Sequence, residues 1–390
     1  MNIDILKILS VLPLLGHPRH SKRIAMLQKA GFMVEAIAFE RNYHTSRMPN
    51  CPVERLSKIS HGLYLQRILK LISALPAIRR AIKRNDLIYA FGPDMAMAAL
   101  IAGWGLRRPV ILEVGDIQRI QVKCGLMGYL TRLMDRYAVN SCKLLVATAP
   151  GFIRGYYREW LHTITPALVL ENKLETPTED TNHMNITTII EGKSLVDRPL
   201  RIGYFGNLRC EWSWQVLEAL ALSRPNEVEI VVAGYPMNPA DLPERAAKLS
   251  NVDFRGVFRS PQDLPTLYGD VDLIWGCYPR PESCDLNWRW ARTNRFYESC
   301  FYQKPIISLK DSGDSIDVER YGIGLIIYGQ SIERVVDVLS GISPDDLVRW
   351  KKNMLMLPRK VYVYTSEGEE LASALEGLVK NNFKNTKNKR

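Results

Sequence analysis

Apolar and polar residues follow one another in blocks along the first 150 residues, and the block lengths fit strands and helices in turn. Short apolar runs, each typical of a buried strand, are found at residues 6–12, 32–39, 86–91, 109–114 and 143–148. Helical stretches are predicted between them at 21–30, 63–84, 93–104 and 125–138. Because alternating strands and helices return each strand parallel to the last, this order predicts a doubly wound parallel sheet.

The same alternation returns in the second half of the chain. A buried strand starts at 201 and runs into a glycine turn, and later strands are predicted at 228–234, 251–257, 271–277 and 305–308. Helices are predicted at 213–223, 262–268, 344–354 and in the segment that starts at 294. The pattern therefore predicts two separate α/β domains with similar architecture.

The composition of the connecting segments indicates where the domains end. We predict an N-terminal domain over 1–172, a mobile polar linker over 173–198 and a C-terminal domain over 199–365. A helix at 366–380 is expected to follow, and then a basic tail at 381–390. Both domains are large enough to bury a core.

The most informative segment begins at Asn294 and Arg295 and continues to Lys304-Pro305. Arg295 and Glu298 are three residues apart, so a helix places them on one face. A carboxylate can accept hydrogen bonds from two neighbouring hydroxyls, as on a ribose, and a cation suits a diphosphate. This turn could therefore hold a nucleoside diphosphate. The alternative is an ordinary amphipathic helix that leads into a buried strand.

A glycine turn earlier in this domain suits the same ligand. Gly206 lacks a Cβ atom, so backbone amides there can approach an anion closely. Asn207 and Arg209 follow at once, and Val257 follows the Phe254-Arg255-Gly256 turn.

The order of these motifs resembles the donor domain of GT-B glycosyltransferases of the GT4 type, over roughly residues 200–310. The resemblance implies two Rossmann-like doubly wound domains that face a cleft. It also implies a nucleotide-sugar donor, expected to be a UDP-sugar, on the C-terminal domain, and an acceptor on the N-terminal domain. The last helix, 366–380, is then expected to cross back to the N-terminal domain. The implied donor-binding residues are Gly206, Asn207, Arg209, Val257, Asn294, Arg295 and Glu298.

Asp116 follows the strand 109–114 and is the candidate catalytic base. A carboxylate there could take the proton of an acceptor hydroxyl as its oxygen attacks C1 of the sugar. This placement resembles the inverting, membrane-associated glucuronosyltransferases of bacterial exopolysaccharide assembly. The alternatives for Asp116 are a helix N-cap or a loop anion. Glu113 should still lie within the strand, and His17 and His20 are further candidates for the base.

Two loops supply candidates for the acceptor and the sugar pocket, because ligands of doubly wound sheets bind beyond the carboxyl ends of the strands. The first, after strand 6–12, contains Gly16, His17 and Arg19, and the second, at 278–290, contains Tyr278 and Glu282. Retaining enzymes of the GT4 type carry a second glutamate eight residues before the one at Glu298. Trp290 stands there, so retention and inversion both stay open.

No metal and no other cofactor is expected. Asp270-Val271-Asp272 matches the Asp-x-Asp metal motif of the other major glycosyltransferase fold. That motif should follow an apolar strand, whereas this one precedes it. The seven cysteines form no Cys-x-x-Cys pair and fit reduced thiols in the cytoplasm.

The net charge of +11 favours an anionic partner. Residues 63–84 combine apolar helical spacing with Arg67, Lys70, Arg79, Arg80, Lys83 and Arg84. Such a helix can lie on an anionic membrane surface. The alternative is a helix packed on its own sheet with a solvated basic rim. No helix-turn-helix, zinc or RNA-binding motif accompanies the charge, so nucleic acid is not expected as a partner.

The chain has no run of 18 apolar residues and starts without the features of a signal peptide. We therefore expect a cytoplasmic enzyme at the inner face of the cell membrane, with a lipid-linked saccharide as acceptor. Two alternatives stay open. One is a binding protein of the same fold without activity, and the other is a UDP-sugar epimerase, which needs no acceptor.

Overall fold

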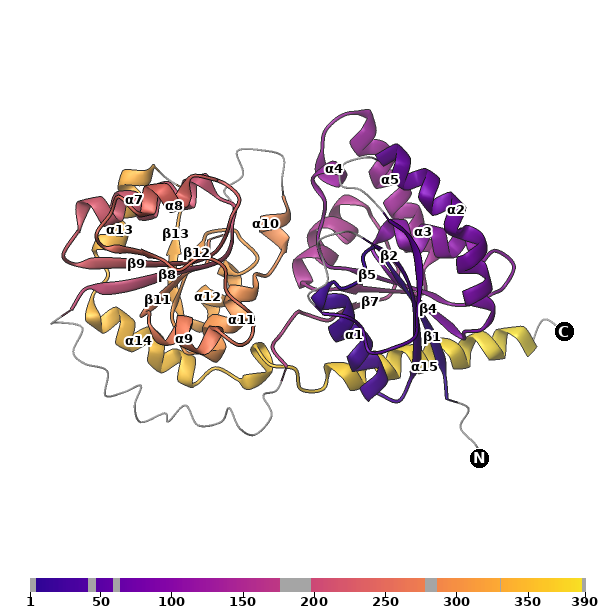
Figure 1. Cartoon of the computed structure of the whole chain (residues 1–390). Coiled ribbons are helices and arrows are strands. Elements are labelled where there is room, and N and C mark those ends of the chain that lie inside the picture. Colours follow the sequence, from indigo (N-terminus) through magenta and orange to yellow (C-terminus); the bar gives the residue numbers. More distant parts are fainter. Residues whose placement is uncertain are drawn as a thin grey trace. The chain divides into compact units, whose positions relative to one another are not determined.

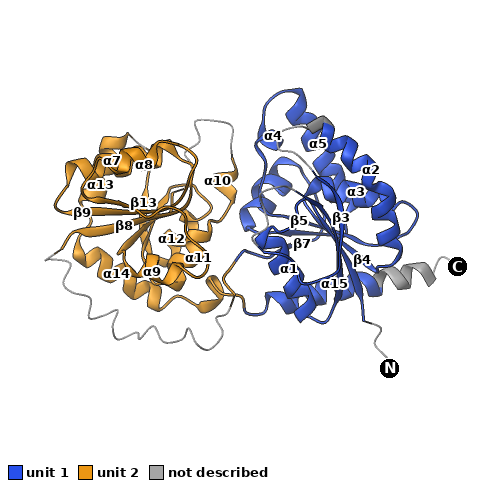
Figure 2. Cartoon of the chain, in the orientation of Figure 1, with its two compact units in different colours: residues 1–172, 365–390 blue, residues 173–364 orange. Residues whose placement is uncertain are grey.

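The structure is a computed structural model, and it describes residues 5–40, 47–58, 64–175, 198–277, 286–329 and 331–387. The chain divides into two compact units (Figure 2). Unit 1 comprises residues 1–172 and 365–390, and unit 2 comprises residues 173–364. Residues 176–197, most of the expected linker, lie outside the described residues.

Within its described residues, unit 1 contains a seven-stranded parallel sheet in the order β3-β2-β1-β4-β5-β6-β7. The strands are β1 (Lys7–Leu12), β2 (Met33–Glu40), β3 (Val53–Lys58), β4 (Leu87–Phe91), β5 (Val110–Val114), β6 (Leu144–Ala147) and β7 (Ala167–Val169). Its helices are α1 (Pro18–Lys29), α2 (Tyr64–Lys83), α3 (Pro93–Ala102), α4 (Arg119–Val122), α5 (Leu126–Ser141), the π-helix η1 (Phe152–Trp160) and α15 (Glu367–Lys387).

Helices cover both faces of this sheet, with α2, α3 and α5 on one side and α1 and α15 on the other (Figure 1). The central strands are almost entirely apolar because both of their faces are buried. Leu371, Leu375 and Val379 of α15 join the core formed by β1, β2 and α1. The C-terminal helix is therefore a part of unit 1.

Unit 2 contains, in its described part, a six-stranded parallel sheet in the order β10-β9-β8-β11-β12-β13. The strands are β8 (Leu200–Leu208), β9 (Val228–Pro236), β10 (Val252–Phe254), β11 (Leu273–Trp275), β12 (Ile306–Leu309) and β13 (Gly324–Ile327). The helices are α7 (Glu211–Ser223), α8 (Leu242–Ala246), α9 (Leu264–Gly269), α10 (Asn287–Trp290), α11 (Asn294–Phe301), α12 (Ser315–Tyr321), α13 (Ile332–Ser340), α14 (Pro344–Leu355) and the 3-10 helix η3 (Arg359–Val361).

Two parallel sheets with flanking helices confirm the predicted α/β class with two Rossmann-like domains. Several elements differ from the prediction. The edge strands β3 and β13 were not predicted, because they are short and only half-buried. Helix α15 runs to Lys387, so residues 381–387 belong to it and not to a separate tail.

Candidate active site

Helix α11 carries Asn294, Arg295 and Glu298, three of the residues predicted to bind the sugar donor. Its N-terminus is held by an N-cap residue and by a second residue that holds the cap. Thr293 is the N-cap, and its hydroxyl accepts a hydrogen bond of 3.2 Å from the backbone N–H of Phe296. Asp314, before α12, accepts bonds from the N–H of Thr293 at 3.0 Å and from its hydroxyl at 2.6 Å. Burial raises the pKa of Asp314 to about 6, against the opposing effect of nearby Arg292. The start of α11 is thus tied to the loop after β12.

Arg295 and Glu298 lie on the side of α11 that faces β8, β11 and α9. The Nη1 atom of Arg295 donates to the carbonyl oxygen of Trp275, at the end of β11, at 3.2 Å. Its guanidinium carbon lies 5.6 Å from the centre of the Tyr204 ring, which belongs to β8. The Glu298 carboxylate accepts a 2.7 Å bond from the Tyr268 hydroxyl. Both functional side chains are half-buried and held by neighbouring elements.

Near their carboxyl ends, β8 and β9 approach each other closely because each has a glycine there. Gly206 has a φ of +107° and open space where a Cβ atom would project, so the backbone there is accessible. A Cβ atom on Gly234 would lie 1.7 Å from the carbonyl oxygen of Gly206. The N–H of Gly234 donates to Gly256 at 2.7 Å, which brings the turn before Val257 to the same edge. Sequence reasoning placed a turn at Gly206, but β8 continues to Leu208.

These residues form one constellation at the carboxyl edge of the sheet in unit 2. Burial raises the pKa of Tyr204, and the charges of Arg295 and Arg209 both oppose the rise, so both guanidinium groups lie near this ring. Two cations beside an open glycine backbone suit a diphosphate, and the Glu298 carboxylate suits the hydroxyls of a ribose. The remaining donor candidates, Asn207, Val257 and Asn294, are exposed at the ends of β8 and β10 and at the start of α11.

Asp272 of the Asp-x-Asp sequence has a structural role. Its carboxylate accepts bonds from Nη1 and Nη2 of Arg198 at 2.7 and 2.8 Å and from the N–H of Arg201 at 3.1 Å. These contacts join the start of β8 to β11 and hold the pKa of Asp272 below its usual value despite burial. In the part of the chain that the structure describes, no three His, Cys, Asp or Glu side chains are grouped as metal ligands.

In unit 1, Asp116 follows β5 and has a side chain that is 51% exposed. The Nη1 atom of Arg19 lies 3.6 Å from its Oδ2 atom. A Cβ atom on Gly115 would overlap the Arg19 guanidinium, so the glycine allows this cation to lie against the loop. Helix α4 is capped by Gln118, which rules out the N-cap alternative for Asp116. The pair with Arg19 remains compatible with a loop anion and with a base.

The other candidates for the base are more enclosed. Glu113 is buried, and it accepts bonds from Nε of Arg23 at 2.7 Å and from the Tyr89 hydroxyl at 2.5 Å. His20 is buried against Phe91 and stacks on His17, with ring centres 4.5 Å apart. Burial lowers the pKa of His20 well below its ordinary value, and Arg19 adds to this effect. Glu113 and His20 therefore support the end of β5 and the start of α1.

The acceptor candidates divide between described and undescribed segments. Gly16 adopts a φ of +82° in the turn after β1, and its carbonyl oxygen accepts the N–H of Arg47 at 3.3 Å. Gly16 and His17 lie between β1 and α1, and Arg19 belongs to the first turn of α1. Tyr278 and Glu282 belong to residues 278–285, which lie outside the described residues.

The cations of residues 63–84 are largely engaged within unit 1. Arg67 pairs with Asp94 of α3, and Arg79 donates to the carbonyl oxygens of Ala102 and Trp104 at 2.6 and 2.9 Å. Arg84 lies within 4 Å of Glu35 and Glu54, and Arg80 lies near Glu54 as well. Among the described residues, no helix has the length and apolar character needed to cross a bilayer.

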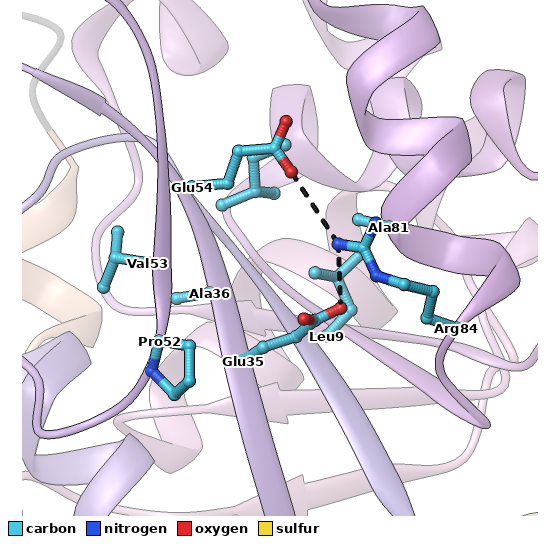
Figure 3. A pocket seen from close by; sticks show the side chains of 9 residues that line it. Leu9, Glu35, Ala36, Pro52, Val53, Glu54, Ala81 and Arg84 are labelled. Carbon is cyan, nitrogen blue, oxygen red and sulfur yellow. Dashed lines mark hydrogen bonds and ion pairs between the residues drawn. The ribbon is translucent and has the colours of Figure 1, made fainter.

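A cavity of about 230 Å³ lies elsewhere in unit 1, between β2, β3 and α2 (Figure 3). Its polar lining consists of Glu35, Glu54 and Arg84, with Arg84 3.4 and 3.8 Å from the two carboxylates. The residues that line it include none of the predicted site residues. Its polar groups satisfy one another, so it is not the candidate site.

Sequence reasoning missed the groups that position the donor residues. Tyr268 belongs to a Leu-Tyr-x-x-x-Asp sequence that ends at Asp272, and this motif could have indicated the contact with Glu298. The contact between Thr293 and Asp314 joins residues that are 21 positions apart, so no local sequence pattern predicts it.

The fold class defined by these two units is that of GT-B glycosyltransferases, as the solved structures similar to it show. Sucrose-phosphate synthase from Thermosynechococcus elongatus matches with a TM-score of 0.69 and 13% identity, over 95% of this chain and 99% of that chain. HepE from Anabaena, in complex with UDP, matches with a TM-score of 0.66 and 16% identity, over 95% of this chain and 100% of that chain.

One curated protein is also similar in sequence. The succinoglycan biosynthesis protein ExoL from Rhizobium meliloti is 27% identical over 351 residues, which is 87% of this chain and 86% of that protein. No known family model matches the chain.

Proposed function

We propose that the chain is a glycosyltransferase that moves a sugar from a UDP-sugar to a saccharide acceptor in bacterial surface-polysaccharide synthesis. The observation that carries the proposal is the fixed pair of Arg295 and Glu298 on α11, beside the open backbone of Gly206. The similarity to ExoL, a protein of succinoglycan biosynthesis, supports the polysaccharide product.

The donor would bind at the carboxyl edge of unit 2. HepE, which has a similar fold, has been crystallised with UDP and with UDP-glucose, which supports UDP as the nucleotide. In our proposal Glu298 accepts hydrogen bonds from the ribose hydroxyls, and the backbone at Gly206 and Arg209 contact the diphosphate. Arg295 stabilises the charge that develops on the departing UDP, so that this step needs no metal ion.

The acceptor would bind to unit 1, near Gly16, His17 and Arg19. The acceptor oxygen attacks C1 of the sugar, the C1–oxygen bond to UDP breaks, and UDP leaves with the bonding electrons. Asp116 takes the proton of the acceptor hydroxyl. Arg19, 3.6 Å from Asp116, holds that carboxylate in the loop after β5.

We further propose that the acceptor is linked to a lipid and that the enzyme works at the cytoplasmic face of the membrane. The excess of 52 Lys and Arg over 41 Asp and Glu supports attraction to an anionic surface. The basic helix α2 was the first candidate for this contact. Several of its cations pair with carboxylates of unit 1, and these ion pairs weaken their attraction to anionic lipids.

A two-substrate assay tests the proposed reaction. The protein is incubated with labelled UDP-glucose, UDP-galactose or UDP-glucuronate, with and without a polyprenyl-diphosphate-linked saccharide. A glycosyltransferase transfers label to the lipid fraction only when the acceptor is present. Conversion of one UDP-sugar into another without acceptor would instead identify an epimerase. UDP binding without any turnover, across the donors and acceptors tried, would identify a binding protein.

A further inference from the structure

Helix α5 presents its large apolar side chains outward and its small residues inward. Side chains exposed on α5 are Leu126, Met127, Tyr129, Leu130, Leu133, Met134 and Tyr137. The residues that face the interior are Gly128, Asp135, Ala138 and Val139. An ordinary surface helix has the opposite arrangement, with its large apolar residues against the core. The outward face of α5 is therefore a continuous apolar surface.

Polar contacts fix this orientation. Asp135 is fully buried beneath α5, and its carboxylate accepts bonds from the side chains of Gln121, Tyr156 and Tyr157. Gly128 lies so close to Lys123 that a Cβ atom would be 1.9 Å from the Lys123 carbonyl oxygen. If the helix were rotated about its axis so that its leucines became buried, these contacts would break and the Asp135 carboxylate would be left without hydrogen bonds. The apolar side is thus held outward.

The charge around this helix has one sign. Residues 117–158 contain one carboxyl side chain, that of Asp135, which is buried. The same stretch contains seven cations, namely Arg119, Lys123, Arg132, Arg136, Lys143, Arg154 and Arg158. Lys123 and Arg136 are exposed beside the apolar face. Apolar side chains flanked by tyrosines and cations match the boundary between acyl chains and anionic head groups.

We propose that α5 lies in the surface of an anionic lipid leaflet, with its apolar side chains among the acyl chains and Lys123 and Arg136 at the phosphates. Helix α2 packs on α3, as α5 does (Figure 1). It exposes Ile68, Leu69 and Ile72, so it adds apolar side chains to this helical layer. The membrane contact rests on the lipid-linked acceptor proposed above. A second copy fits this face less well, because two identical basic surfaces repel each other.

Vesicle sedimentation with the full chain tests this surface. Wild-type protein should bind vesicles of phosphatidylglycerol and phosphatidylethanolamine and not vesicles of phosphatidylcholine. The double variant Leu130→Gln/Leu133→Gln should lose at least about tenfold in partitioning, since both side chains are exposed and their loss disturbs no core. The matched control, Leu222→Gln/Val348→Gln, changes two exposed residues of unit 2 in the same way and should bind as wild type does.

Charge and assembly are tested separately. Lys123→Gln/Arg136→Gln and high salt should each weaken binding to anionic vesicles. Equal binding by the α5 variants and the unit 2 control would overturn the proposal. Light scattering could instead show that the wild type is a dimer and that Leu130→Gln/Leu133→Gln is a monomer that still binds vesicles. That result would also overturn the proposal, because the apolar face would then be a dimer interface. UDP titration of the same samples separates the proposals, because failure to bind vesicles with normal UDP binding refutes the membrane surface alone.

Discussion

The hydroxyl of Tyr268 donates a hydrogen bond of 2.7 Å to the Oε2 atom of Glu298. Tyr268 is buried, and burial together with Glu298 raises the pKa of its hydroxyl well above the usual value, so it remains a donor at neutral pH. Its ring also stacks on Tyr302 with centres 4.9 Å apart. A rigid aromatic donor thus fixes one oxygen of the carboxylate that we assign to the ribose.

Tyr268→Phe should weaken UDP binding because the Glu298 carboxylate is no longer held in position. The variant keeps the ring and loses only the hydroxyl, which we expect to reduce affinity about three- to tenfold, equivalent to about 1 kcal/mol for one hydrogen bond. In the double variant with Glu298→Ala, the second change should add little, because both act through the same contact. Fully additive losses in calorimetry would show that Tyr268 does not act through Glu298.

Asp116→Asn should separate chemistry from donor binding. The amide cannot take a proton, so sugar transfer should fall by roughly 100-fold or more while UDP affinity is kept. Asp345→Asn, at an exposed position of α14, serves as the control and should retain full turnover. Turnover of Asp116→Asn within a few-fold of wild type would assign Asp116 to the loop contact with Arg19 and leave the base to be found elsewhere.

Thr293→Ala should affect both stability and the donor site. Loss of the N-cap hydroxyl should lower the free energy of unfolding by about 1 kcal/mol. Because the cap also sets the start of α11, UDP affinity should fall as well. Ser343→Ala removes the N-cap of α14 and is a matched control. It should cost similar stability without any change in UDP binding, and an equal effect of both variants on UDP would contradict the local role of Thr293.

Stability should depend on pH through Asp135. Burial raises its pKa from 3.8 to about 6, so the folded protein retains a proton that the unfolded chain has released. The resulting stabilisation is fully present below the unfolded pKa and is lost as the pH rises through about 6, a difference of about 3 kcal/mol. Asp135→Asn should remove this part of the dependence, measured as the free energy of unfolding between about pH 3.5 and 7. An unchanged slope would refute the assignment.

The alternation of strands and helices was enough to predict both sheets, since central strands such as 110–114 are apolar except for the buried Glu113. Two of the edge strands, β3 and β13, gave no such signal. Val53–Lys58 reads as polar because one edge and part of both faces are exposed. Helix α2 was read correctly across Pro76, as a solvent-facing position tolerates the lost hydrogen bond better than a buried one.

In the candidate site, contacts between residues close in sequence could be predicted, and contacts between residues far apart in sequence could not. Arg295 and Glu298 are three residues apart, so helical periodicity alone placed them together. The contact of Arg19 with Asp116 joins residues from two separate loops, and the space for it depends on Gly115. The outward face of α5 was also not evident, because the sequence shows periodicity and does not show which side faces the core. A buried carboxylate, Asp135, decides that side.

The central claim is that α11 binds a nucleoside diphosphate, and calorimetric titration of UDP tests it most directly. Wild-type protein should bind UDP, and Arg295→Ala and Glu298→Ala should each lose about 1–3 kcal/mol of binding free energy while remaining folded. The neighbouring pair Glu333→Ala and Arg334→Ala removes the same charges from exposed positions on α13 and should bind UDP as wild type does. Unchanged UDP affinity in both Arg295→Ala and Glu298→Ala would contradict the account.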